Sequence, residues 1–168
     1  MNRRTFLAYA STTAALALLS ACGFRLRGSN GEANLPFKTI LIGFPETSPL
    51  GAELKRNIRA NGTSIVTDPK QAEAVFELLS EQREKVILSL NSQGRVREYT
   101  LYYRLKFRVK DNSSKELLAP TEIVLKRDIT FNESQALAKE AEEGLLYRDM
   151  QSDMVQQILR RLVALKPH

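Results

Sequence analysis

The sequence predicts an α+β two-layer sandwich, with a four-stranded, mostly antiparallel sheet and two helices on one face. Apolar and polar residues alternate through residues 99–110, which is typical of a strand with one buried face. Apolar residues recur every three or four positions in 48–61 and again near the C-terminus, which is typical of amphipathic helices. The expected element order is β-α-β-β-β-α, in a single domain over residues 37–166.

The first elements are a short strand and a helix. Residues 37–43 form an apolar run that predicts the strand. Ser48 predicts the helix start, because its hydroxyl can cap free N–H groups, and Pro49 fits the first turn. The helix would bury the stripe Leu50, Leu54 and Ile58.

The segment after this helix is predicted to be mostly irregular. Asn61 and Gly62 tolerate positive φ and should end the helix. Residues 64–67 are expected to form only a short extended piece, and residues 68–71 a capped turn.

Three long strands should follow, at residues 74–90, 99–110 and 116–131, separated by polar turns at 91–94 and 111–114. At about 3.3 Å per residue, such strands span about 40–50 Å. The inward side of the middle strand would hold Tyr99, Leu101, Tyr103, Leu105, Phe107 and Val109. Its outward side would hold Thr100, Tyr102, Arg104, Lys106, Arg108 and Lys110. The third strand would turn Ile123, Leu125, Ile129 and Phe131 inward.

A long helix should complete the domain and end near Leu165. Asn132 and Gln135 have the spacing of a capping box at its start. Gly144 is expected to divide it into a short and a longer piece. Its buried stripe would hold Met150, Met154, Val155, Ile158, Leu159 and Leu162.

The N-terminus has the features of a lipoprotein export signal. Arg3 and Arg4 precede a short apolar stretch at residues 6–19, and two small residues then precede Cys22, the single cysteine. We therefore expect cleavage of residues 1–21, attachment of diacylglycerol and an acyl chain to Cys22, and a lipidated tether over residues 22–36. An ordinary cleaved signal with an incidental cysteine is the alternative.

The predicted location is the outer membrane. Gly23 follows the cysteine where an Asp would favour retention in the inner membrane of enterobacteria. The paired arginines also resemble a twin-arginine signal, so the route of export stays open between that pathway and the general one.

The net charge favours an anionic partner. The whole chain carries +6, and loss of Arg3 and Arg4 leaves +6 − 2 = +4. Nucleic acid is not expected in the periplasm, whereas anionic lipid or lipopolysaccharide is. No second apolar run is long enough to span a membrane.

The sequence does not predict an enzyme. Its one histidine, His168, is the last residue, and acylation would occupy Cys22. No Gly-x-Ser-x-Gly motif and no glycine-rich phosphate loop occurs. No metal and no cofactor is expected beyond the covalent lipid. Glu140, Glu142 and Glu143, beside Lys139, have the pattern of a solvated helix face.

Basic residues gather in the second long strand and the turn before it. They are Arg95, Arg97, Arg104, Lys106 and Arg108. They form either a solvated sheet face or a binding site for phosphates, which Arg contacts through two N–H groups and Lys as a point charge.

The mature chain resembles the lipopolysaccharide-assembly lipoprotein family LptE. Its opening, Cys22-Gly23-Phe24-Arg25-Leu26-Arg27-Gly28, is similar to the family's Cys-Gly-aromatic-x-Leu-Arg start. Further similarity covers Asn61-Gly62, Glu98-Tyr99, the segment 131–140 with Gln135-Ala136-Leu137-Ala138-Lys139-Glu140, and residues 157–162.

The resemblance implies a non-enzymatic protein that plugs the lumen of the large outer-membrane barrel LptD, helps that barrel assemble, and contacts lipopolysaccharide. It implies contact through Lys139 and through an Arg in the hairpin before the turn glycine. Ser92 and Gln93 occupy that stretch here, so Arg95 and Arg97 are the expected substitutes. Arg104 and Lys106 complete the candidate contact residues.

Two other functions stay open from the sequence alone. One is a free periplasmic lipoprotein that binds anionic lipid through a basic sheet face. The other is an enzyme whose site carries no recognisable motif.

Overall fold

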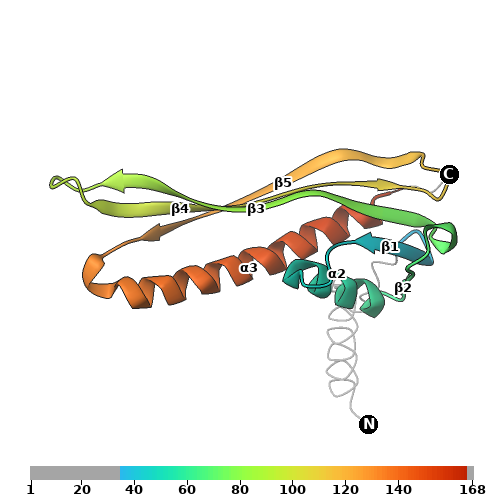
Figure 1. The fold of residues 1–168 in the computed structure, drawn as a ribbon, viewed down its shortest axis with the longest axis horizontal. Coiled ribbons are helices and arrows are strands. Elements are labelled where there is room, and N and C mark those ends of the chain that lie inside the picture. The colour runs from blue at the N-terminus through green and yellow to red at the C-terminus, as the bar shows by residue number, and fades with distance from the viewer. Residues whose placement is uncertain (1–34, 166–168) are drawn as a thin grey trace, which may run out of the picture. The chain divides into compact units, whose positions relative to one another are not determined.

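The computed structural model describes residues 35–165, which fall within one compact unit of the chain. One sheet has the strand order β2-β1-β3-β4-β5, and two helices cover one of its faces (Figure 1). The strands are β1 (Thr39–Gly43), β2 (Ser64–Ile65), β3 (Ala74–Leu90), β4 (Val96–Lys110) and β5 (Glu116–Thr130). The helices are α2 (Pro49–Ala60) and α3 (Ala136–Val163), with 3₁₀ turns η1 (Pro69–Gln71) and η2 (Glu133–Gln135).

The α+β class and the helix layer agree with the prediction, but the expected four-stranded, mostly antiparallel sheet is wrong. The sheet has five strands and is mixed, because β1 pairs in parallel with both β2 and β3. The fifth strand is the expected extended piece after α2. Its two residues align Ser64 with Thr39 and Ile65 with Ile40. A strand of two residues is too short to show the alternation of apolar and polar residues by which strands are predicted.

The three long strands are confirmed as one antiparallel unit, β3-β4-β5. β4 lies in the middle, and its burial alternates as its sequence does, with Tyr103 and Leu105 fully buried and Arg104 and Lys106 on the opposite side. The helix-facing side packs against α3, whose fully buried residues are Met150, Met154, Val155, Ile158 and Leu162.

Both helices begin close to where the sequence predicts. The Ser48 hydroxyl caps α2 by accepting a hydrogen bond from the Gly51 N–H at 3.1 Å. Asn132 caps η2, so that α3 itself starts four residues later, at Ala136. The expected break at Gly144 is absent: α3 runs through it for 28 residues, since packing of the helix against the sheet outweighs the low helix propensity of one glycine.

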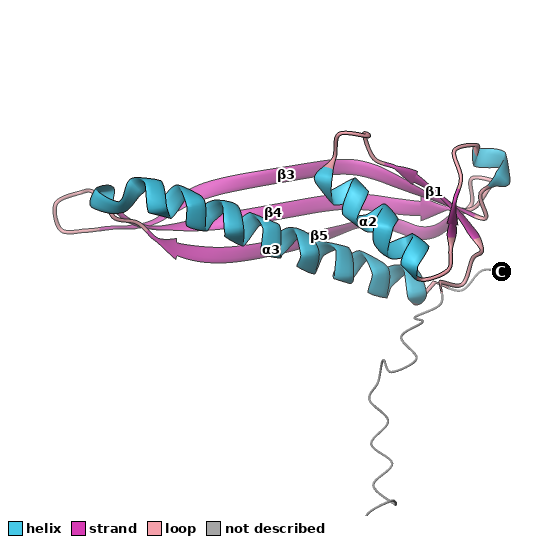
Figure 2. Ribbon diagram, turned by 90° about the horizontal axis from the view of Figure 1, so that it is seen from below, coloured by secondary structure: helices cyan, strands magenta, loops and turns pink. Residues whose placement is uncertain are grey.

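α3 runs along nearly the whole length of the long strands, and α2 lies beside its C-terminal part (Figure 2). β1 pairs only with the first part of β3, from Ala74 to Glu77. The other end of β3 turns into β4 at a hairpin that lies near the start of α3 (Figure 1). Within residues 35–165, no helix combines the length and apolar character needed to cross a bilayer.

Two glycine-to-alanine substitutions should change stability in opposite directions. A Cβ at Gly51 would lie 2.6 Å from the Cβ of Phe44, which is buried, so Gly51→Ala should destabilise the fold by about 1–3 kcal/mol. A Cβ at Gly144 meets nothing within 4 Å, so Gly144→Ala should stabilise α3 by about 0.5–1 kcal/mol. Urea unfolding of both variants measures the two effects. A stabilising Gly51→Ala would contradict the described packing of Phe44 on α2.

Candidate functional site

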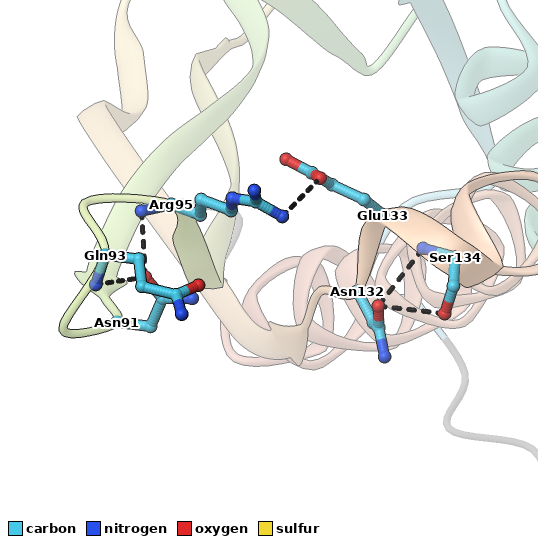
Figure 3. Close-up of polar contacts among 6 residues, drawn as sticks. All are labelled: Asn91, Gln93, Arg95, Asn132, Glu133 and Ser134. Carbon is cyan, nitrogen blue, oxygen red and sulfur yellow. Dashed lines mark hydrogen bonds and ion pairs between the residues drawn. The ribbon is translucent and has the colours of Figure 1, made fainter.

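The turn between β3 and β4 is held by a single asparagine. The Asn91 Oδ1 accepts hydrogen bonds from the N–H groups of Gln93 and Arg95, each at 2.9 Å (Figure 3). Gly94 has a φ of +75°, a backbone conformation that favours glycine. This arrangement fixes Arg95 at the base of the turn, where its carbonyl also accepts a hydrogen bond from the Asn91 N–H at 2.8 Å.

The start of η2 faces this turn. The Asn132 Oδ1 accepts hydrogen bonds from the Ser134 N–H and hydroxyl, at 3.1 and 3.0 Å. The next residue, Glu133, reaches across to Arg95, with 3.4 Å between Oε2 and Nη1 (Figure 3). The two segments enclose an open depression of about 270 Å³. Its lining is Asn91, Arg95, Val96, Arg97, Phe131, Asn132 and Glu133.

Lys139, on the first turn of α3, lies near the same end of the sheet. Its Nζ is 3.1 Å from the Thr130 Oγ1, at the end of β5, and 2.8 Å from a carboxylate oxygen of Glu142. The side chain is only 17% exposed. The acidic run beside it is therefore not simply solvated, because Glu142 pairs with Lys139 and Glu143 pairs with Lys85 at 2.6 Å.

The structure thus places three of the predicted contact residues, Arg95, Arg97 and Lys139, around one end of the molecule. We call them the hairpin cluster. Arg97 lies near the start of β4, and its carbonyl accepts a hydrogen bond from the N–H of Phe131, the residue that follows β5, at 2.8 Å. Its side chain is exposed and has no ion-pair partner among the described residues. The other two cations of the cluster are paired with carboxylates.

Arg104 and Lys106 lie elsewhere. They point from β4 to the face of the sheet without helices, which we call the open face. Seven and nine residues separate them from Arg97, or about 23–30 Å along the strand. Arg104 lies 3.8 Å from a carboxylate oxygen of Glu84 and stacks over the ring of Tyr102. The sequence could not show this separation, because both groups occur in one basic stretch.

The open face is mixed in charge and not simply basic. Glu77 on β3 pairs with Arg108 at 2.5 Å and with Lys110 at 3.2 Å, and the Arg108 hydrogen bond lowers the pKa of the Glu77 carboxyl. Lys106 is opposite Glu122 of β5 in the strand register, and Asp128 accepts a hydrogen bond from Thr100. Such cross-strand pairs depend on register, which sequence patterns do not give.

A polar network that the sequence did not suggest joins the sheet to the helices. The Tyr103 hydroxyl donates to Glu81 at 2.6 Å and lies 3.3 Å from Arg83, which also donates to Gln151 of α3. Burial raises the pKa of Tyr103 far above its usual value. The phenol therefore stays neutral and acts as a structural donor. In the described part of the chain, no group of three His, Cys, Asp or Glu residues is placed to hold a metal ion.

Cys22, the predicted lipidation site, lies outside the described residues, as do the signal 1–21 and most of the tether 22–36. The described chain begins at Leu35, which is already buried in the core, as is Phe37.

The chain matches a family described as "LptE: Lipopolysaccharide-assembly" over residues 37–162. It is 25% identical to the LPS-assembly lipoprotein LptE of Pectobacterium atrosepticum over 153 residues, which cover 90% of this chain and 82% of the relative. It is also 25% identical to the protein of the same name from Yersinia enterocolitica, covering 89% and 72%.

Solved structures show the same fold. The solution NMR structure of an uncharacterized lipoprotein B from Nitrosomonas europaea is similar with a TM-score of 0.72 and 43% identity, covering 84% of this chain and 91% of that one. The crystal structure of the rare lipoprotein B from Shewanella oneidensis gives a TM-score of 0.67 and 28% identity, covering 75% and 94%.

The ion pairs of Glu77 should make stability depend on acid pH. Its pKa is lowered in the folded state, so its contribution is present above the pKa of the unfolded chain and is lost as pH falls through the folded pKa. Glu77→Gln should lower the unfolding free energy by about 0.5–1 kcal/mol at pH 7. Below pH ~4.5, the unfolding free energy of this variant should fall less with acidification than that of the parent. Glu84→Gln, at a longer and more exposed pair, is the control and should change little. Equal effects of the two substitutions would contradict the account.

Proposed function

The chain belongs to the LptE lipopolysaccharide-assembly family, and we propose that it is an outer-membrane lipoprotein that plugs an LptD-type β-barrel. It helps this barrel to assemble and contacts lipopolysaccharide during delivery to the outer leaflet. The match over residues 37–162 carries the proposal, because it covers the whole folded part except its ends. The function is non-enzymatic and needs no cofactor.

The open face supports the plug function. A plug in a polar lumen needs a polar outer surface on rigid elements. Three long paired strands supply the rigidity, and the open face supplies charges that are already balanced by neighbours such as Glu77 with Arg108. A balanced polar surface can exchange water for lumen side chains without leaving one sign of charge unpaired.

The hairpin cluster supports the contact with lipopolysaccharide. Arg95 and Arg97 can each donate two hydrogen bonds to a phosphate, and Lys139 adds a third positive charge near them. Glu133 and Glu142 hold two of the three cations in the free protein, so a phosphate would have to replace these carboxylates. Arg104 and Lys106 enter this proposal only as a second contact area on the open face.

Attachment to the outer membrane is proposed through diacylglycerol and an acyl chain on Cys22. The chain would then sit within the barrel lumen or face the periplasm. A free lipoprotein that binds anionic lipid through a basic sheet face has less support, because acidic residues of β3 and β5 balance the cations of β4.

The barrel partnership is tested by purification from membranes. The full chain with a C-terminal affinity tag, extracted from outer membranes in mild detergent, should bring one large outer-membrane barrel with it in equal amounts. The complex should persist through size exclusion, since a plug buries much of its surface. A chain that is always recovered alone would contradict the plug function.

The contact with lipopolysaccharide is tested at Arg97, which has no ion pair to lose. Arg97→Glu should weaken binding of purified lipopolysaccharide by about tenfold or more, because a charge-assisted contact becomes a repulsion. Arg148→Glu, at an exposed cation in the middle of α3, is the matched control and should bind as the parent does. Thermal unfolding should be nearly unchanged in both. Unchanged binding by Arg97→Glu would remove this residue from the site.

A further inference from the structure

One basic surface remains outside the functions described so far. It lies on the outward side of α2, where Arg56 and Arg59 are exposed and Lys55 is half-buried. Lys38, exposed just before β1, lies beside the end of this helix. None of these four side chains has an ion-pair or hydrogen-bond partner among the described residues, although the backbone N–H of Lys38 donates to the Glu73 carboxylate at 2.7 Å. We call them the α2 patch.

The one acidic residue of α2 does not neutralise the patch. Glu53 points toward α3, where its carboxylate accepts hydrogen bonds from the Gln151 amide at 2.7 Å and the Ser152 hydroxyl at 2.9 Å. The other exposed positions of the helix, Pro49, Ala52 and Ala60, are uncharged. The α2 patch therefore differs from the hairpin cluster and the open face, where most cations are paired with carboxylates.

The α2 patch lies where the predicted tether enters the fold. The residues before β1 run beside the end of α2: the Thr63 hydroxyl donates to the Phe37 carbonyl at 3.2 Å, and the Ser64 N–H donates to the Lys38 carbonyl at 2.9 Å. Cys22 is 13 residues before Leu35 in the sequence. Even a fully extended tether therefore keeps the lipidated residue within about 45 Å of this point.

We propose that the α2 patch rests on anionic phospholipid headgroups of the leaflet that holds the acyl chains of Cys22. The proposal rests on the proposed lipidation and goes beyond it by assigning a contact surface. Phospholipid phosphates are fixed anions at high density, and clustered Lys and Arg side chains are attracted to such a surface. A short tether raises the effective concentration of this surface beside the patch, so that weak individual contacts suffice.

This contact would also set the orientation of the protein. α2 lies on the helix face of the sheet, toward the half that is farther from the β3–β4 hairpin (Figures 1 and 2). With the outward side of α2 on the anchoring leaflet, the helix layer would face that leaflet and the open face would face away from it (Figure 1). The lipid anchor alone, on a tether of this length, would leave the orientation free.

Vesicle binding of the unlipidated chain tests the proposal without the anchor. The full chain carrying Cys22→Ser should bind vesicles of phosphatidylglycerol mixed with phosphatidylcholine more tightly than vesicles of phosphatidylcholine alone, and added salt should weaken the binding. Adding Arg56→Gln and Arg59→Gln should weaken binding to the anionic vesicles by about tenfold or more. The control pair, Lys126→Gln with Arg148→Gln, removes two exposed cations elsewhere and should leave binding within about twofold. All variants should unfold at similar temperatures.

Three results would overturn the proposal: equal binding of the α2 variant and the parent, equal binding to neutral and anionic vesicles, or equal loss in the control pair. A fourth result would also overturn it. If the α2 variant binds vesicles as the parent does but no longer recovers the barrel or binds lipopolysaccharide, the patch contacts one of those partners instead. Mass measurement of the membrane-extracted chain tests the lipidation separately. An unmodified Cys22 would contradict the proposed anchor whatever the vesicles show.

Discussion

Burial of the apolar face of β4 is the constraint on which the structure depends. Leu101, Tyr103, Leu105, Phe107 and Val109 are all fully buried against the helix layer. Because a strand sends alternate side chains to opposite faces, the same strand must send its charged residues to the open face. β3 and β5 pair with β4 along nearly its whole length, so they share this division. A long, rigid, polar surface is thus a consequence of how the core is built.

The sequence was sufficient where periodicity extends over many residues. It predicted the three long strands, the cap of α2 at Ser48 and the buried stripe of α3, because each rests on a repeating pattern or a local hydrogen bond. It did not reveal that β2 is a strand, since two residues in a parallel pair carry no pattern. It wrongly predicted a break at Gly144, where burial of the residues around Met150 maintains the helix.

The candidate site was only partly predictable for a related reason. Residue type identified the cations, but their pairing depends on register and on contacts between distant segments. Arg95 meets Glu133 across 38 residues, and Lys85 meets Glu143 across 58. Arg97, Arg104 and Lys106 belong to one basic stretch of the sequence and all lie on β4, but in the structure Arg97 is far along the strand from the other two, which lie on the open face. The α2 patch was not predicted from the sequence, because residue type alone does not show which cations lack an ion-pair partner.

Three surfaces with different charge states follow from this arrangement. The open face is polar and balanced, which suits the lumen of a barrel. The hairpin cluster has two cations paired with carboxylates and one arginine without an ion pair among the described residues, which suits a phosphate ligand that binds and leaves. The α2 patch is basic and unpaired beside the entry of the tether, which suits a lasting contact with an anionic leaflet. The family membership over residues 37–162 places the chain among lipopolysaccharide-assembly proteins, and the role of each surface is our proposal.

The central claim, that the open face is enclosed by a partner, is tested most directly by thiol labelling at Val124, which is 44% exposed on this face. Val124→Cys introduces the one reactive thiol if Cys22 is acylated. We predict fast alkylation by a water-soluble maleimide in the isolated protein and strongly slowed alkylation in intact outer membranes. Alkylation at the same fast rate in both would contradict the claim.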